Sequence, residues 1–310
     1  MVEGIFEMLL LRWGLLALAL VTLMQTASAQ DFLGPEACQK CHKPEFTVWE
    51  DTPHAALFDE FHRNRDARDI VKEVGDRNPK KSEVCILCHY TALTDASGEP
   101  DPVAGPSCES CHGAASDWIE IHNNYGGQGV TAEQESAEHE AQRINDAAAA
   151  GMIWPHMTYD ATRNCFTCHG LNNDALDVAT LEIMLDAGHP VNGDFEYIAY
   201  SQGQVRHRFY PPDRDVNQEL TAAESAEWYL VGQAASLVAA TEGSARTSHP
   251  DYVAAMEVRI ARATEALSRI DVGAAVLADP TEANAEAFAL AIAGQDHSAA
   301  VSDLVPTEYK

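Results

Sequence analysis

The sequence predicts a mainly α protein whose mature chain has two parts, and three observations support this. Residues 30–210 contain all eight cysteines and many Pro and Gly residues, which favours short helices joined by long loops. Residues 211–310 lack cysteine and carry several helix-start signals, which favours a C-terminal helical bundle. Residues 1–29 have the pattern of a signal peptide.

The signal pattern consists of Arg12, an apolar run over residues 13–24 and a small-residue cleavage site, Ala-Ser-Ala, at residues 27–29. The run is too short to cross a bilayer comfortably, so we expect cleavage and export to the periplasm or the extracellular space. A retained membrane anchor is the alternative. No other segment is apolar enough to span a membrane, so no span is expected after cleavage.

Helix signals place three helices in residues 211–310. Thr221 and Glu224 form a capping box that opens a helix to about residue 240. Pro250 lies near the start of a second helix, which runs to about residue 270, and Pro280 near the start of a third, which ends around Gly294. Steps of three and four place the apolar residues of the second helix on one face: Val253, Met256, Ile260, Ala263 and Leu267. We expect this bundle to support the first part; a docking or oligomerisation surface is the alternative.

One longer helix is also expected within the first part. Thr131 and Gln134 form a capping pattern before an alanine- and glutamate-rich run, which predicts a single helix over residues 131–150. His139 lies in this helix and is expected to face solvent rather than bind a metal.

Four copies of Cys-x-x-Cys-His carry the chemistry of this chain. In this motif two thiols form thioethers to the vinyl groups of a c-type haem, and the adjacent imidazole binds the iron. The expected thioether residues are Cys38, Cys41, Cys85, Cys88, Cys108, Cys111, Cys165 and Cys168. The expected proximal iron ligands are His42, His89, His112 and His169. The sequence therefore predicts four covalently bound haem c groups, around which the short helices and long loops of residues 30–210 are arranged.

Paired Cys-x-x-Cys units also occur in zinc ribbons and in redox dithiols, but neither requires histidine after the second cysteine. A zinc ribbon places its two pairs about 15–20 residues apart. Here only the second and third motifs are that close, so haem attachment is favoured.

The chain is strongly acidic, with a formal net charge of −28 at pH 7. Loss of Glu3, Glu7 and Arg12 with the signal peptide would change this charge by a single unit. Such a charge disfavours nucleic acid and anionic membranes as partners and favours redox partner proteins with basic surfaces. A highly soluble or halophilic surface explains the charge equally well, and the sequence leaves the oligomeric state open.

The ligand on the opposite side of each iron determines the function to be expected. A second strong ligand gives an electron carrier, whereas an open position gives a catalyst or a gas-binding site. Nine histidines lie outside the motifs, enough for four bis-histidine irons: His54, His62, His122, His139, His156, His189, His207, His249 and His297.

Two stretches resemble the tetrahaem cytochrome c-554 family. The first motif is followed by Trp49-Glu50-Asp51-Thr52-Pro53-His54-Ala55, and the third motif by Gly113, with His122 ten residues after His112. The resemblance covers about residues 34–170. It implies an electron carrier in which His54 is the distal ligand opposite His169, and His122 the distal ligand opposite His42.

Beyond the matched region, His189 and His207 are the natural ligands for the irons of His89 and His112, in an order that the sequence leaves open. His62 and His156 are reserve candidates. Arg206 and Arg208 flank His207, where they either pair with haem propionates or lie in solvent.

The leading prediction is a periplasmic or extracellular tetrahaem cytochrome that carries single electrons between redox partners, rather than an enzyme. In the resembling family one haem, the second, lacks a strong distal ligand. An alternative is therefore an oxidoreductase with one open iron, His89 being the first suspect, that acts on nitric oxide, nitrite or hydroxylamine. A further alternative is a subunit of a cytochrome filament.

Overall fold

The computed structural model describes residues 31–310. The expected signal peptide at residues 1–29 lies outside the described residues. The fold is mainly α, as predicted, with 57% helix and 3% strand. Within residues 31–310, no helix is long and apolar enough to cross a membrane.

Residues 31–89 form short helices and 3₁₀ turns, and side-chain caps fix the starts of two of these helices. Thr52 accepts a hydrogen bond from the backbone of Ala55, and Asn64 accepts one from Ala67, so two helices begin directly after these residues. The elements of this region are α2 (Glu36–Gln39), α3 (Lys43–Glu50), α4 (Pro53–Glu60), the 3₁₀ turn Phe61–Arg63, α5 (Arg65–Glu73), the 3₁₀ turn Pro79–Lys81 and α6 (Glu83–His89).

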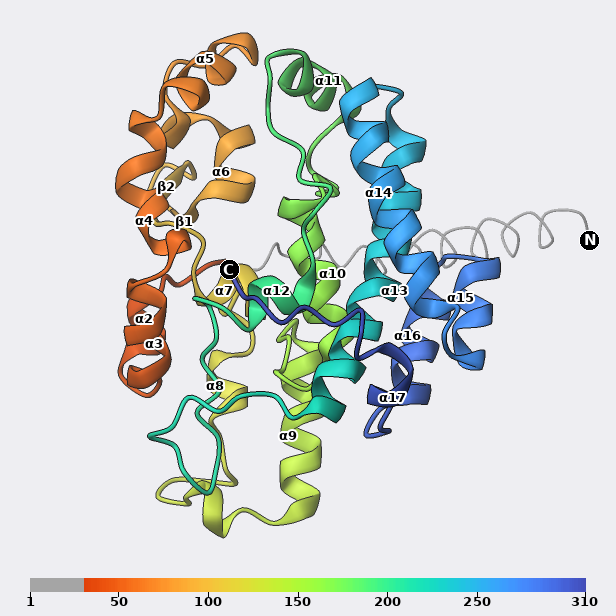
Figure 1. Ribbon diagram of the computed structural model, residues 1–310. Coiled ribbons are helices and arrows are strands. Elements are labelled where there is room, and N and C mark those ends of the chain that lie inside the picture. The colour runs from red at the N-terminus through yellow and green to blue at the C-terminus, as the bar shows by residue number, and fades with distance from the viewer. Residues whose placement is uncertain (1–30) are drawn as a thin grey trace, which may run out of the picture. The chain divides into compact units, whose positions relative to one another are not determined.

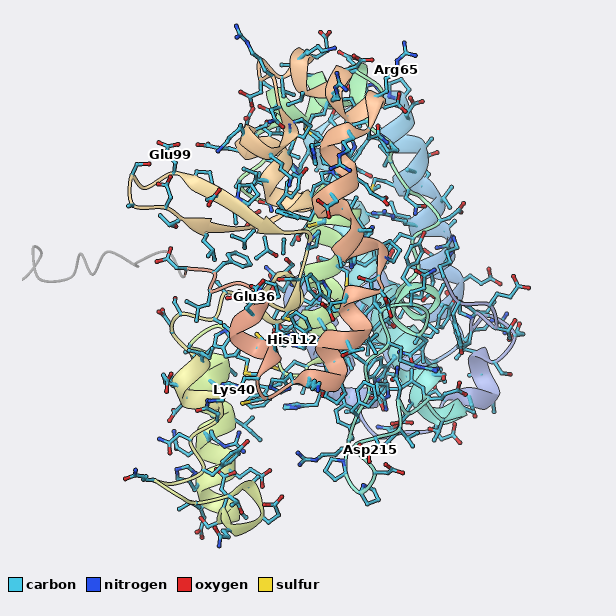
Figure 2. All side chains as sticks on the ribbon, turned by 90° about the vertical axis from the view of Figure 1, so that its left-hand side faces the viewer. Glu36, Lys40, Arg65, Glu99, His112 and Asp215 are labelled. Carbon is cyan, nitrogen blue, oxygen red and sulfur yellow. The ribbon has the colours of Figure 1, made fainter. Side chains whose placement is uncertain are left out.

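An antiparallel hairpin of β1 (Thr91–Thr94) and β2 (Pro100–Ala104) follows α6 and was not predicted from the sequence. Its turn is closed by Asp95, whose carboxylate accepts hydrogen bonds from the backbone of Ser97 at 2.7 Å and of Glu99 at 3.0 Å. In Figure 2 the label on Glu99 marks the tip of this hairpin, which projects away from the helices.

The predicted single helix over residues 131–150 is wrong in its first turn. The capping box of Thr131 and Gln134 is present, but it opens only a 3₁₀ turn, Ala132–Gln134. The helix proper is α9 (Ala137–Ala149), which starts afresh from Ser136 as its N-cap. The break occurs at Glu135, which has an extended backbone and whose carboxylate is held by Arg143.

The remaining middle helices are short, and the C-terminal helices are longer. The middle helices are α7 (Cys108–His112), α8 (Ile119–His122), α10 (Thr158–His169), α11 (Val178–Asp186) and α12 (Tyr197–Ser201). The C-terminal ones are α13 (Ala222–Arg246), α14 (Pro250–Leu267), α15 (Ala274–Ala278), α16 (Glu282–Ile292) and α17 (Ser298–Val301), with a 3₁₀ turn at Asp271–Gly273. The three predicted C-terminal helices are therefore present, with α13 six residues longer than expected.

The largest core is built around α13, whose residues 229–240 are all buried. Helices α10, α12, α14, α16 and α17 pack around it, and Figure 1 shows α10, α13 and α14 side by side. Phe166 of α10 and Ile198 of α12 enter this core together with Leu230 and Leu267. Because α10 ends in the fourth Cys-x-x-Cys-His motif, the C-terminal helices directly support that motif.

Candidate haem-binding sites

Each Cys-x-x-Cys-His motif lies on a helical turn. The second and fourth motifs end α6 and α10, the third forms α7, and the first begins with the last two residues of α2. On a helix, residues three apart share a face and the next residue lies beside them. The two thiols and the imidazole of each motif therefore point to the same side, as attachment to one haem requires.

Every motif histidine faces one histidine from elsewhere in the chain. We number these histidine pairs by motif and give the distance between ring centroids. The first pair is His42–His122 at 6.3 Å, the second His89–His189 at 6.3 Å, the third His112–His207 at 6.2 Å and the fourth His169–His54 at 6.1 Å. The four values agree within 0.2 Å, although the partners come from four different segments.

This spacing fits two imidazoles on opposite sides of one iron. A metal–imidazole bond is about 2.0–2.1 Å long and the ring centre lies about 1.1 Å beyond the nitrogen, so the two ring centres would be about 6.2–6.4 Å apart. Within residues 31–310, no group of three or more His, Cys, Asp or Glu side chains could hold a bare metal ion. Two imidazoles would complete the coordination of an iron that already has four porphyrin ligands.

Backbone hydrogen bonds leave the correct imidazole nitrogen free in four of these rings. The Nδ1 atom of His112 lies 2.8 Å from the carbonyl of Ile153, and that of His122 lies 2.6 Å from Ile119. The Nδ1 atoms of His189 and His207 similarly lie 3.0 Å and 2.6 Å from the carbonyls of Pro190 and Val205. A carbonyl can only accept, so each Nδ1 carries the proton and each Nε2 has its lone pair available for a metal.

Burial keeps most of these imidazoles neutral. It lowers the pKa of His89 to about 3, with help from the nearby His189, and lowers the pKa values of His112 and His169 to about 4. His42 differs, because the Glu45 carboxylate beside it raises its pKa. Iron binds the neutral ring, so for the buried rings protons compete weakly with the metal at neutral pH.

The distal candidates are positioned by local structure. His54 sits in the first turn of α4, where its backbone is pressed against the end of β2. A Cβ on Gly105 would lie only 1.9 Å from the carbonyl oxygen of His54, so this close approach requires glycine. His122 ends α8, whereas His189 and His207 lie in loops after α11 and α12. Because these two loops have no helical or strand periodicity, the sequence does not indicate where the two side chains point.

The motifs themselves are in contact. Cys38 lies beside Cys108, and Cys88 lies beside Cys168. Asn164 of α10 donates to the carbonyl of Ser110 at 2.7 Å, which joins the third motif to the fourth. The first motif is thus next to the third, the third next to the fourth, and the fourth next to the second. Figure 2 shows His112 of the third motif close to α10, within this cluster.

The other histidines have different surroundings. His139 pairs with Glu135 at 2.6 Å, and its side chain is 39% exposed. It therefore faces solvent, as expected, but is held by an ion pair. His249 lies 3.5 Å from Asp186, and His156 stacks on Trp154. The reserve candidate His62 has a buried Nδ1 without a hydrogen-bond partner in the described part of the chain.

Arg206 and Arg208 both pair with protein carboxylates. Arg206 lies 3.1 Å from Glu219, and Arg208 lies 3.1 Å from Glu224 while its guanidinium covers the Trp228 ring at 5.0 Å. These contacts fasten the loop that carries His207 to the start of α13.

Sequence reasoning missed Glu109, the second residue of the third motif, which is 2% exposed. Its carboxylate accepts hydrogen bonds from the backbone of Leu33 at 2.9 and 3.0 Å, of Gly34 at 2.8 Å and of Ala115 at 2.8 Å. Glu109 thereby joins the segment before the first motif to the third motif, and no local pattern signals this role.

Helical Cys-x-x-Cys-His turns, each with a second imidazole at iron-spanning distance, define the class of c-type cytochromes. Residues 37–113 match the family model described as "Cytochrome c554 and c-prime". The cytochrome c-554 of Nitrosomonas europaea is 30% identical over 123 residues, which cover 36% of this chain and 52% of that protein. Both comparisons show that part of the chain is similar to the cytochrome c-554 family.

The chain therefore spans about half the length of the curated relative it matches. No solved structure matches it. The cytochrome c family binds haem c covalently, and the sites described above are where this chain would hold such a group.

Proposed function

We propose that this chain is a tetrahaem electron carrier in which two histidines hold each iron. The observation that carries the proposal is the uniform separation of the four histidine pairs, 6.1 to 6.3 Å between ring centroids. Bound haem iron supplies one-electron redox chemistry, and a second strong ligand closes the iron to substrates. The chain's own contribution is to fix the ligands and the spacing between the sites.

The second histidine pair is the most important one for this proposal, because the sequence pointed to the iron of His89 as the one that could lack a distal ligand. His189 faces it at the same distance as in the other pairs, and Phe61 stacks on the His89 ring at 3.9 Å. These two contacts support a bis-histidine site in which no position on the iron is open. The oxidoreductase alternative would require His189 to be displaced.

Contacts between the motifs support an order for electron movement. Cys38 lies beside Cys108 and Cys88 beside Cys168, so the first site is next to the third and the second is next to the fourth. Asn164 links the third and fourth motifs. We infer the order first, third, fourth, second, with exchange with partners at the first and second sites.

The partners are inferred from charge. A net charge of −28 favours proteins that present basic surfaces around their own redox centres. The signal pattern at residues 1–29 favours export, so we place the carrier in the periplasm or outside the cell.

Addition of carbon monoxide to the fully reduced protein tests the closed sites. The expected result is an unchanged absorption spectrum, together with a redox titration in which four one-electron components are resolved. A carbon monoxide complex amounting to about a quarter of the haem would contradict the proposal and favour the oxidoreductase.

A further inference from the structure

Arg259 of α14 is a completely buried cation, with 0% of its surface exposed. One of its terminal nitrogens donates to the carbonyl oxygens of His169 and Asn192, both at 2.5 Å. The other lies 4.0 Å from the sulfur of Met256, and the guanidinium carbon lies 5.2 Å from the Phe166 ring centre. In the described residues its polar contacts are thus carbonyls and a thioether, and no carboxylate forms an ion pair with it.

Three side chains from the C-terminal helices hold consecutive carbonyls at the end of α10. Arg259 binds the carbonyl of His169, Tyr252 donates to that of Gly170 at 2.8 Å, and Arg246 donates to that of Leu171 at 2.6 Å. The last carbonyls of a helix lack partners within the helix and attract cations. We call Arg246, Tyr252 and Arg259 the carbonyl clamp; it fixes the helix end that carries the proximal histidine of the fourth pair.

Arg143 provides an internal comparison. It also donates to the carbonyl of an expected iron ligand, His122, at 2.8 Å. Its charge, however, is balanced by Glu135 through two bonds of 2.8 and 2.7 Å. Both arginines therefore bind the carbonyl of an expected ligand, but among residues 31–310 only Arg143 also pairs with a carboxylate.

We propose that Arg259 is a positioning residue that fixes His169 through its carbonyl and, as an unbalanced buried cation, raises the reduction potential of the fourth haem. The proposal rests on the ligation proposed above. Ferric haem carries one more positive charge than ferrous haem, so a nearby cation destabilises the oxidised state. Low local polarity increases this effect, because water cannot screen the charge.

This assignment gives residues 211–310 a direct part in the electron path. In the inferred order the fourth site lies between the third and the second. A raised potential there draws electrons inward from the first and third sites and holds them next to the second. Helix α14 thus adjusts the redox chemistry of a motif about 90 residues earlier in the chain, through a carbonyl bond and a charge.

Two independent variants remove the charge effect in different ways, and both are compared by spectroelectrochemical titration of the complete four-haem protein. Arg259→Met removes the cation at similar volume. Met256→Glu keeps Arg259 and supplies a carboxylate next to it, with Met256→Gln as its neutral control. We expect Arg259→Met and Met256→Glu each to shift one of the four components to lower potential and to leave the other three in place. Met256→Gln should leave all four unchanged.

Further variants identify the component and separate charge from shape. His54→Met replaces a ligand of the fourth pair and should raise the same component, because methionine ligation raises haem potentials. Arg259→Lys keeps the charge and should retain most of the potential. Arg262→Gln, one turn along α14, removes a partly exposed arginine that already faces Asp194, and should have no effect on any component.

The proposal is overturned if the four potentials are unchanged in Arg259→Met or in Met256→Glu while all haems remain low-spin. It is also overturned if Arg259→Lys lowers the component as much as Arg259→Met does. A high-spin fourth haem in the wild-type protein would instead contradict the ligation on which the proposal rests, so the two failures are distinguishable.

Discussion

The imidazole planes of His112 and His207 are 77° apart, whereas those of His42 and His122 are only 24° apart. Two parallel rings interact with the same one of the two iron d orbitals of π symmetry, and this separates the energies of the two orbitals. Perpendicular rings treat the two orbitals alike and leave them nearly degenerate. The third and first histidine pairs should therefore give different magnetic signatures, even though both place two histidines on one iron.

Electron paramagnetic resonance of the oxidised protein checks this difference. We expect one signal with a very large maximal g value from the third pair and one ordinary rhombic low-spin signal from the first. His207→Ala should remove the former and leave the latter. Removal of the rhombic signal by His207→Ala would show that the two pairs are wrongly assigned.

Replacement of the second distal histidine should open a single iron. In His189→Ala we expect one haem in four to become high-spin and to bind carbon monoxide when reduced, because nothing else in the pair supplies a strong ligand. The measurement is the absorption spectrum with and without carbon monoxide. His156→Ala serves as the matched control, since His156 stacks on Trp154 and should leave every haem low-spin. An unchanged spin state in His189→Ala would remove this residue from the ligand set.

Glu109 should be important for stability rather than for ligation. Glu109→Gln puts an amide donor against backbone donors and leaves buried groups unsatisfied, at a cost of about 1–3 kcal/mol. We expect a lower thermal midpoint with four haems still attached. Glu36→Gln, which alters an exposed carboxylate nearby in the chain, is the control. Equal midpoints for Glu109→Gln and wild type would show that the four backbone hydrogen bonds contribute little.

The Glu135–Arg143 pair gives a pH dependence with a defined direction. The Arg143 guanidinium lowers the pKa of Glu135 to about 2, from an ordinary value near 4.5. A carboxyl group whose pKa is lowered by folding stabilises the folded state at pH values above its ordinary pKa. This contribution is lost as the pH falls from about 4.5 to about 2. The thermal midpoint of wild type should therefore exceed that of Glu135→Gln at pH 6, and the difference should shrink over this window. A difference that stays constant down to pH 2 would rule out this ion pair as its source.

The sequence was informative wherever chemistry is local. Cysteine and histidine spacing predicted the four motifs, and the capping box at Thr221 and Pro280 predicted the starts of α13 and α16. The partners proposed for His42 and His169 came from residues that resemble a known family. The capping pattern at Thr131 was misleading, because the contact of Glu135 with Arg143 interrupts the helix that it would otherwise open.

The contacts that could not be predicted join segments that are far apart in the sequence. Nothing in the loops around His189 and His207 indicates which motif each approaches, because one histidine is chemically like another. Arg259 does carry a weak signal, since it falls three residues after Met256 and four before Ala263 on the buried stripe of α14. Its contact with His169, 90 residues earlier, emerges only when α10 and α14 pack against α13.

Counting low-spin haems in the oxidised wild-type protein tests the central claim most directly. Quantitative electron paramagnetic resonance, set against the haem content per chain, should give four low-spin haems and no high-spin signal. A high-spin signal from about a quarter of the haem would contradict the account, because it would mean that one of the four histidine pairs does not close its iron.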